Sequence, residues 1–157
     1  MAKEKVRGFE VIADWAREVP GVEVKLPQRA TKRSAAYDIF ALTSGVIEPG
    51  QKAYFPTDIK AYMSEDEVLH VYPRSSQGIK LDLMLSNTIA VIDSDYYNNP
   101  TNDGHIGIYL RNLGDKPVTI SIGDRIAQAQ FMKYLIADHD NADVLPERTG
   151  GVGHTGR

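Results

Sequence analysis

The segment LSNTIAVIDSDY, residues 85–96, carries an apolar strand pattern that runs directly into two carboxylates and an aromatic ring. Ile89 to Ile92 fit the end of a half-buried strand, which places Asp93 at the mouth of an apolar surface. A carboxylate there can accept a hydrogen bond from water and orient it, and Tyr96 can stack on a flat ring. From this segment alone, the alternative interpretation is a strand end with an Asx turn and solvated aspartates.

Short runs with strand character recur between turn signals along the rest of the chain. Glu48-Pro49-Gly50 and the segment 113–117 are such turn signals, helical periodicity is nearly absent, and Asp14 to Val19 fit one helical turn. This spacing predicts an all-β sandwich or barrel with antiparallel strands. The expected strands are 22–26, 36–42, 51–55, 68–72, 83–92, 105–110, 118–122 and 126–134.

The composition is that of a soluble globular protein of one domain, with 157 residues, 42% of them hydrophobic and 25% charged. The chain has no cysteine, which excludes disulfides, thiolate metal sites and cysteine nucleophiles. A net charge of -3 offers no basic surface for a nucleic-acid backbone. No apolar stretch approaches the roughly 20 residues that span a bilayer, so we expect a cytoplasmic protein without nucleic-acid or membrane partners.

Two segments fall outside the strand rhythm. Residues 97–104, YNNPTNDG, form a polar loop, which by itself resembles an ordinary hairpin connection. Residues 148–157, RTGGVGHTGR, form a glycine-rich basic tail. The tail is either a disordered terminus or a flexible arm whose amides and arginines wrap a polyphosphate. We therefore divide the chain into a β domain, 1–147, and an arm, 148–157.

Three further segments place polar side chains at strand ends or in apolar runs. PRSSQG at 73–78 supplies a guanidinium, hydroxyls and a glycine suited to phosphate oxygens, although a surface turn with a paired arginine fits as well. In GDRIAQ at 123–128, the acid and the arginine can simply pair with each other. In AAYDIFA at 35–41, one aspartate interrupts an apolar strand and needs a donor or a hydrated metal if it is buried.

Common catalytic motifs are missing. None of the four histidines stands at a metal-binding spacing, and serine, histidine and acid form no recognisable triad motif. The glycines of the tail are not followed by the Lys-Ser or Lys-Thr pair of a P-loop. Standard kinase and NTPase chemistry is thereby disfavoured.

Taken together and in this order, the segments resemble the five motifs of the homotrimeric dUTPase family, the deoxyuridine triphosphate nucleotidohydrolases, of bacterial or phage type. The resemblance extends from Ala35 to Arg157. The five matching segments are AAYDIFA (35–41), PRSSQG (73–78), LSNTIAVIDSDY (85–96), GDRIAQAQF (123–131) and RTGGVGHTGR (148–157).

The resemblance implies a distorted β jelly roll, also called a β-clip, with a flexible C-terminal arm that closes over the nucleotide. It implies a homotrimer whose active sites are each built from three chains. The implied reaction is the magnesium-assisted hydrolysis of dUTP to dUMP and pyrophosphate, which limits uracil in DNA and supplies dUMP for dTMP synthesis. The implied enzyme is a dUTP diphosphatase, with Mg²⁺ as cofactor.

The resemblance also assigns roles residue by residue. Asp93 matches the acid that activates the water attacking the α-phosphorus, and Tyr96 matches the ring that packs on deoxyribose and excludes a 2′-hydroxyl. Asp38 matches an acid that holds the hydrated magnesium. The residues that match uracil contacts are Asn87, Val91 and Ile92, and those that match phosphate contacts are Arg74, Ser75, Ser76, Gln128, Arg148, Gly153, His154 and Thr155.

Two departures from the family pattern concern the arm and the second motif. The common fifth motif carries an aromatic residue that stacks on uracil, where this chain has Val152 in a segment one residue shorter. Tyr97, on a loop longer than the usual tight hairpin, is a candidate substitute for that lid. At Ser76 many members have glycine, and the hydroxyl either adds a phosphate contact or fills space.

Two competing functions remain open at this point. A dCTP deaminase shares the fold and also binds a pyrimidine deoxynucleoside triphosphate, but the AVIDSDY segment resembles the hydrolase form. A dUTPase-like nucleotide-sensing protein that binds a regulatory protein partner, with the 97–104 loop as the contact surface, is the second alternative.

Overall fold

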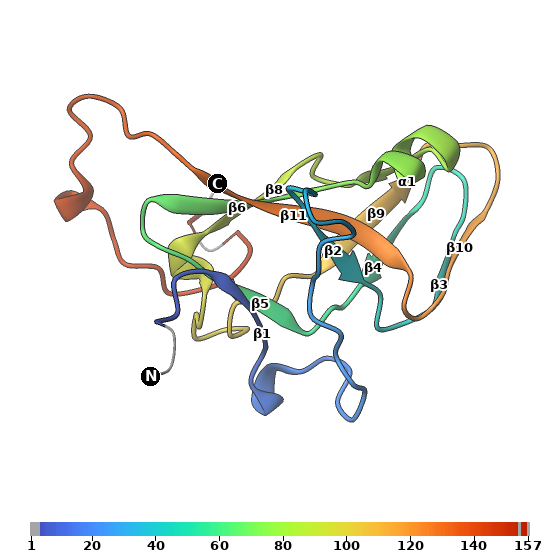
Figure 1. Cartoon of the computed structure of the whole chain (residues 1–157), viewed down its shortest axis with the longest axis horizontal. Helices are drawn as coiled ribbons and strands as arrows, with labels where there is room; N and C mark the ends of the chain where they lie inside the picture. Colours follow the sequence, from blue (N-terminus) through green and yellow to red (C-terminus); the bar gives the residue numbers. More distant parts are fainter. Residues whose placement is uncertain (1–3, 154, 157) are drawn as a thin grey trace.

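The computed structural model describes residues 4–153 and 155–156, and these are arranged almost entirely as antiparallel strands (Figure 1). One short α-helix, α1 (Ser75–Lys80), and three 3₁₀ turns, η1 (Asp14–Ala16), η2 (Ser94–Tyr96) and η3 (Ala142–Val144), complete the described part. The strands are β1 (Gly8–Val11), β2 (Tyr37–Phe40), β3 (Gly45–Ile47), β4 (Lys52–Phe55), β5 (Ile59–Tyr62), β6 (Glu67–Tyr72), β7 (Leu83–Leu85), β8 (Ala90–Asp93), β9 (Ile108–Asn112), β10 (Val118–Ile120) and β11 (Arg125–Lys133).

The strands pair into four small sheets. The largest has the order β2-β11-β6-β8, and a three-stranded sheet has the order β4-β9-β7. The pairs β1-β5 and β3-β10 form the two remaining sheets, and all pairings are antiparallel. Most neighbours in these sheets are distant in sequence, as the predicted jelly-roll architecture requires.

A single apolar core lies between the sheets. Along β9, Ile108, Leu110 and Asn112 are buried while Tyr109 and Arg111 are exposed, so alternate residues face the core and the outer surface. The same alternation fixes which side chains of the other strands reach the core. Large side chains that are fully buried include Phe55, Ile39, Ile47, Ile59, Leu69, Leu83, Leu85, Leu110 and Ile126.

The predicted strand over 83–92 is wrong in one respect, because two strands occupy it. β7 ends at Leu85 and β8 begins at Ala90, and between them Thr88 adopts a left-handed backbone with φ of 63°. β7 pairs with β9, whereas β8 pairs with β6, so the chain changes sheets here. The predicted strand over 22–26 is also absent from the described structure, which has only an isolated bridge between Gln28 and Asp38 nearby.

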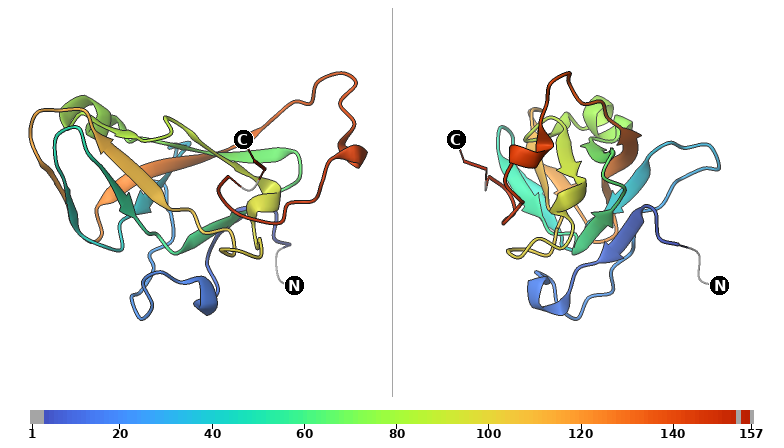
Figure 2. Two further views of the ribbon diagram at one scale, coloured as in Figure 1. Left: turned by 180° about the vertical axis from the view of Figure 1, so that it is seen from behind. Right: turned by 90° about the vertical axis from the view of Figure 1, so that its left-hand side faces the viewer.

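The C-terminal segment leaves the body and returns to it. After β11, residues 134–147 extend outward through η3, and the following residues run back past η2 (Figures 1 and 2). Leu135, Ile136, Val144 and Leu145 on this protrusion are all more than 60% exposed. No described helix has the length and apolar character to cross a membrane.

Candidate active site

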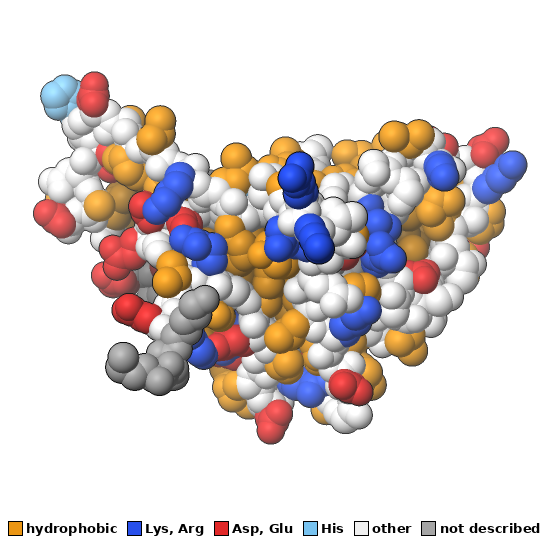
Figure 3. Space-filling view, in the orientation of Figure 1, with side chains coloured by type: hydrophobic (Ala, Val, Ile, Leu, Met, Phe, Trp, Pro, Cys, Tyr) orange, Lys and Arg blue, Asp and Glu red, His pale blue; other side chains and the backbone are white. Residues whose placement is uncertain are grey.

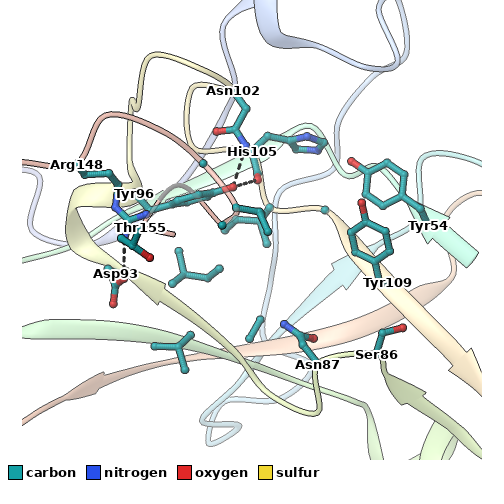
Figure 4. Close-up of a pocket in the computed structure, with 18 of the residues that line it drawn as sticks. Tyr54, Ser86, Asn87, Asp93, Tyr96, Asn102, His105, Tyr109, Arg148 and Thr155 are labelled. Atoms are coloured by element: carbon teal, nitrogen blue, oxygen red, sulfur yellow. Dashed lines mark hydrogen bonds and ion pairs between the residues drawn. The ribbon is translucent and has the colours of Figure 1, made fainter. Parts of the chain in front are cut away.

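A cavity of about 660 Å³ lies where β8, η2, the 97–104 loop and the returning arm meet (Figure 4). Its lining combines carboxylate, amide, guanidinium, hydroxyl and aromatic groups. The residues that line it are Glu18, Lys52, Tyr54, Ser86, Asn87, Ala90, Val91, Ile92, Asp93, Tyr96, Asn102, His105, Ile106, Gly107, Tyr109, Arg148, Gly151, Val152, Gly153 and Thr155.

Asp93 stands at the end of β8, where the backbone turns into η2. Asp93 pairs with Val68 of β6 across the sheet, and this pairing fixes the position at which the carboxylate leaves the sheet. The side chain is 54% exposed, and its Oδ2 accepts a hydrogen bond of 2.7 Å from Nη2 of Arg148. Nε of Arg148 donates to Oδ1 of Asp95 over 2.6 Å. The arm therefore places one guanidinium across the two carboxylates predicted from the sequence.

Tyr96 is buried in η2, and two hydrogen bonds fix the orientation of its hydroxyl. The hydroxyl donates to the carbonyl oxygen of His105 over 2.8 Å and accepts from Nδ2 of Asn102 over 2.9 Å. Burial raises the pKa of the phenol, so the group stays neutral at physiological pH. Its ring lies under the guanidinium of Arg148, 5.7 Å from Cζ to the centroid. The ring is thus held rigidly at the cavity wall.

The predicted uracil contacts lie along the same cavity. Asn87, Val91 and Ile92 all line it, with Asn87 in the turn between β7 and β8. β8 pairs with β6 on one side only, so its other edge, next to the cavity, can offer backbone groups to a ligand. Sequence reasoning and structure agree on the position of this group of residues.

The predicted phosphate contacts of the second and fourth motifs lie elsewhere. Arg74 and Ser76 line a separate cavity of about 440 Å³ between α1 and the turn before β11, and neither lines the first cavity. Ser75 begins α1, and the side-chain amide of Gln128 donates to the carbonyl of Pro73 over 3.0 Å. α1 is near one end of the molecule and the returning arm near the other (Figure 1). A single chain therefore does not bring the two groups together.

Asp38 lies beside this second group, where two arginines contact its carboxylate. Its side chain is 9% exposed, Oδ1 accepts from Nε of Arg74 over 2.9 Å, and Oδ2 accepts from Nη1 of Arg125 over 3.4 Å. Each carboxylate oxygen thus has one guanidinium partner and keeps a further lone pair that can accept a hydrogen bond. Within the described residues, histidines and acids form no cluster of three that could hold a metal ion. In this arrangement Asp38 holds the two arginines in place, and its role toward hydrated magnesium stays a prediction.

The prediction that Tyr97 closes the cavity does not match its position. The Tyr97 side chain is not part of the lining, and its hydroxyl donates to Oε2 of Glu10 over 2.6 Å. Its ring packs edge-on against Tyr62 and lies 4.8 Å from Nζ of Lys60. Partners on β1 and β5 hold Tyr97 on the far side of its loop, which sequence alone does not reveal.

The arm residues Val152, Gly153 and Thr155 line the cavity as expected, and Val152 is 93% exposed. Since so little of the valine is covered, it contributes little packing at this position. The predicted phosphate contact His154 lies outside the described residues.

Sequence reasoning missed the opposite wall, formed by Glu18, Tyr54, His105 and Tyr109. The Tyr54 and Tyr109 rings stand 4.6 Å apart, and the Tyr54 hydroxyl donates to Oε1 of Glu18 over 2.8 Å. Tyr54 and Tyr109 occupy outward positions of paired strands, which in sequence resemble ordinary surface residues. The pairing of β4 with β9, which brings them together, carries no local signal.

His105 is locked in one tautomer. Its Nε2 accepts hydrogen bonds from the backbone amides of Thr57, over 3.2 Å, and Asp58, over 3.0 Å, so the ring proton resides on Nδ1. Nδ1 lies 3.1 Å from Oε1 of Glu18. Burial lowers the pKa of this imidazole, although the carboxylates of Glu18 and Asp58 act in the opposite sense. The histidine is therefore a neutral structural group.

This lowered pKa predicts a specific pH dependence of stability. Below about pH 6.5 the unfolded chain takes up a proton at this histidine before the folded chain does, so the free energy of unfolding falls as pH decreases. Urea unfolding between pH 7 and pH 5 should show this decline. In His105→Gln the decline should be smaller, and an equal decline in both proteins would contradict the assignment. ¹⁵N NMR should show the proton on Nδ1.

Comparison with known proteins agrees with the geometry. A sequence model of the dUTPase family matches residues 22–156. The deoxyuridine 5′-triphosphate nucleotidohydrolase of Lactococcus lactis is 45% identical over 152 residues, covering 97% of this chain and 99% of the relative. The corresponding enzyme of Pseudomonas entomophila is 37% identical over 142 residues, covering 87% and 90%.

Solved structures agree as well. The crystal structure of dUTPase from Streptococcus mutans has a TM-score of 0.72 and 39% identity, covering 83% of this chain and 98% of that one. The dUTPase of phage phi11 of S. aureus has a TM-score of 0.67 over 90% of this chain and 98% of that one, and at 21% identity it supports the fold alone. The chain belongs to the dUTPase family.

Proposed function

We propose that the protein is a dUTP diphosphatase that hydrolyses dUTP to dUMP and pyrophosphate in the 660 Å³ cavity. The observation that carries this proposal is the meeting of Asp93, Tyr96, Asn87 and Arg148 in one lining. A carboxylate, a buried ring, an amide and a guanidinium are the groups needed to activate water, hold a sugar, read a base and bind phosphate.

In the proposed reaction, the Asp93 carboxylate accepts a proton from a water molecule as its oxygen attacks the α-phosphorus. The bond from that phosphorus to the bridging oxygen breaks, and pyrophosphate leaves with the electron pair. The position of the Asp93 carboxylate relative to the water and the α-phosphorus decides its efficiency as a base. Arg148, 2.7 Å from Asp93, lies where it can neutralise charge on the phosphate oxygens.

The residues of β8, of the turn before it and of η2 that line the cavity would select the base and the sugar. Asn87 and the backbone at Val91 and Ile92 would read the donor and acceptor edge of uracil. Cytosine reverses one donor and one acceptor, so it would leave buried polar groups unpaired, which can discriminate by roughly 10⁴-fold. Asn102 and His105 hold the ring of Tyr96 in place. Packed on the deoxyribose, this fixed ring would leave no space for a 2′-hydroxyl.

Magnesium enters this proposal with the substrate. The dUTPase of phage phi11, as a D95N mutant, is described with a structural Mg(II) ion. In the present chain Asp38, which contacts Arg74 and Arg125, is the residue that would hold the ion through a bound water. When bound to the triphosphate, Mg²⁺ would neutralise charge that repels the attacking water.

We further propose that the active sites are shared between chains of a homotrimer. The group around Arg74 lies in a different cavity from Asp93, so a neighbouring chain has to supply it. The 134–147 protrusion, on which apolar side chains stand exposed (Figure 3), is a surface suited to burial against such a neighbour. The number of chains at one site, three in the sequence prediction, stays a prediction, as does the cytoplasmic location.

Mixed trimers test the shared site. Asp93→Asn and Arg74→Gln should each be nearly inactive alone, but co-expression under two affinity tags should restore activity. If the two groups come from different chains, one of the three sites in each mixed trimer contains both native residues. Mixed trimers as inactive as the parents would show that each chain builds its own site.

Product analysis distinguishes this function from the alternative deaminase. Incubation with dUTP should give dUMP and pyrophosphate by chromatography, while dCTP should keep its amine. Deamination of dCTP with dUTP left intact would overturn the proposal. The nucleotide-sensing protein with a regulatory partner stays a prediction, for which a pull-down with and without dUTP is the test.

A further inference from the structure

The 97–104 loop is internally braced by one buried amide. The Asn99 side chain is 4% exposed, and its Nδ2 donates to the Tyr96 carbonyl over 2.9 Å and to Oδ1 of Asn102 over 2.6 Å. Its Oδ1 accepts from the backbone amide of Thr101 over 3.1 Å and from the Thr101 hydroxyl over 2.9 Å. Because the buried amide of Asn99 has hydrogen-bond partners for both its nitrogen and its oxygen, the loop has a defined structure.

The loop is also fixed to the body by a buried charge. Nζ of Lys60, on β5, donates to Oδ1 of Asn98 over 2.5 Å and to Oδ2 of Asp103 over 2.7 Å. The same Asp103 oxygen accepts from the backbone amide of Ala13 over 2.7 Å. Both ends of the loop are therefore held, at β5 and at the residue that precedes η1, and the loop presents a fixed outer surface.

The C-terminal arm rests on that surface at Gly151. The Gly151 amide donates to the Thr101 hydroxyl over 2.9 Å. A Cβ at Gly151 would lie 3.0 Å from Nδ2 of Asn102 and 3.2 Å from Oγ1 of Thr101. Glycine is thus the residue that allows the arm backbone to approach the loop this closely.

Asn102 joins this contact to the substrate pocket. The Nδ2 atom that faces Gly151 also donates to the Tyr96 hydroxyl over 2.9 Å, and Asn102 itself lines the cavity. The loop consequently touches the ring assigned to the sugar and the arm assigned to the phosphates. The neighbouring Val152 is 93% exposed and cannot anchor the arm by packing.

We propose that the 97–104 loop is the docking site of the C-terminal arm, with Thr101 and Asn102 as positioning residues that hold Gly151 over the occupied cavity. The loop contact supplies the anchoring that an aromatic residue at Val152 would otherwise provide. The inference rests on the proposed function, since it concerns closure over dUTP. It assigns the loop a role in substrate retention through Thr101 and Asn102, whereas the sequence analysis proposed Tyr97 as the residue of this loop that closes the site.

A double-mutant cycle tests the contact. Thr101→Val removes the acceptor at nearly constant shape, Gly151→Ala obstructs the approach from the arm side, and the pair is made in one chain. Each single variant should raise KM for dUTP by about 3- to 10-fold, the loss expected for one hydrogen bond, and change kcat less. The double variant should be no worse than the poorer single variant, because both remove the same contact. Thr101→Ser should retain native KM.

Limited trypsin cleavage after Arg148 gives a second readout, in the presence of a non-hydrolysable imido analogue of dUTP. The analogue should protect the native arm and the Thr101→Ser arm, and it should protect the Thr101→Val and Gly151→Ala arms much less. Thr43→Val is the matched control, since Thr43 lines neither cavity, and it should behave as the native protein.

Three results would overturn the inference: native KM and protection in Gly151→Ala, native KM and protection in a folded Thr101→Val, or multiplicative effects in the double variant. Gly151 lies outside the apolar core, so its variant stays informative even if Thr101→Val folds poorly. Failure of the native protein to hydrolyse dUTP would instead overturn the proposed function, which keeps the two failures distinct.

Discussion

Asp93→Asn is expected to lower kcat for dUTP hydrolysis by about 10³-fold, because it removes a general base without changing the shape of the side chain. In the native protein Arg148 lies 2.7 Å from the Asp93 carboxylate. The asparagine oxygen can still accept a hydrogen bond from Arg148, so the arm should still dock. The dissociation constant of the imido analogue should therefore change little. Pyrophosphate release gives kcat, and calorimetric titration gives the affinity.

Asp95→Asn is the matched control for this variant. Asp95 binds the same guanidinium over 2.6 Å and is similarly exposed, at 57%, but it stands outside the cavity lining. We expect a change of only a few fold, through KM, since exposed ion pairs are worth little. If Asp95→Asn loses as much turnover as Asp93→Asn, the loss reflects arm placement and Asp93 is not the base.

Asp58→Asn is expected to lower the free energy of unfolding by about 3 kcal/mol, the scale on which breaking a buried ion pair destabilises a protein. The Asp58 side chain is fully buried, and its oxygens accept from Nε of Arg17 over 3.0 Å and from the amides of Glu18 and Val19 over 2.9 and 3.1 Å. Asparagine tolerates the left-handed backbone at this position, φ 52°, so the substitution isolates the charge. Denaturant unfolding measures the effect at one protein concentration.

Asp66→Asn serves as the control for stability. Asp66 pairs with Lys133 on the surface, where both side chains are more than 60% exposed, and its substitution should leave the free energy of unfolding nearly unchanged. A loss below about 1 kcal/mol for Asp58→Asn would contradict the view that this carboxylate ties the 17–19 segment to the body. That segment carries Glu18 into the cavity wall, so the substitution should also raise KM.

Local patterns predicted much of the fold. The strands β2, β4, β6, β10 and β11 fall within or within one residue of predicted strands, because alternating burial leaves a period of two in the sequence. β1, β3 and β5, each of three or four residues, were not predicted from the sequence. The division of 83–92 into two strands depends on the left-handed backbone at Thr88. Threonine rarely adopts this conformation, so the sequence does not indicate it.

The site was predictable where its residues are consecutive. Asp93 and Tyr96 stand in one segment that places both at the cavity, and the tail residues that line it belong to one glycine-rich run. The other site residues are placed by contacts between distant parts of the chain, which the sequence does not show. Glu18 reaches the wall through Asp58, 40 residues away in sequence, and Tyr97 turns toward Glu10 on β1. The contacts of Asp38 with Arg74 and Arg125 were hidden for the same reason, since these residues meet only in the folded chain.

The most direct test of Asp93-guided attack on the α-phosphorus is hydrolysis of dUTP in water enriched in ¹⁸O, with both products analysed by mass spectrometry. If the water beside Asp93 attacks the α-phosphorus, a single turnover should place one ¹⁸O in the phosphate of dUMP and none in pyrophosphate. Label in pyrophosphate would mean that attack occurs at the β-phosphorus, and would contradict the proposed position of the water.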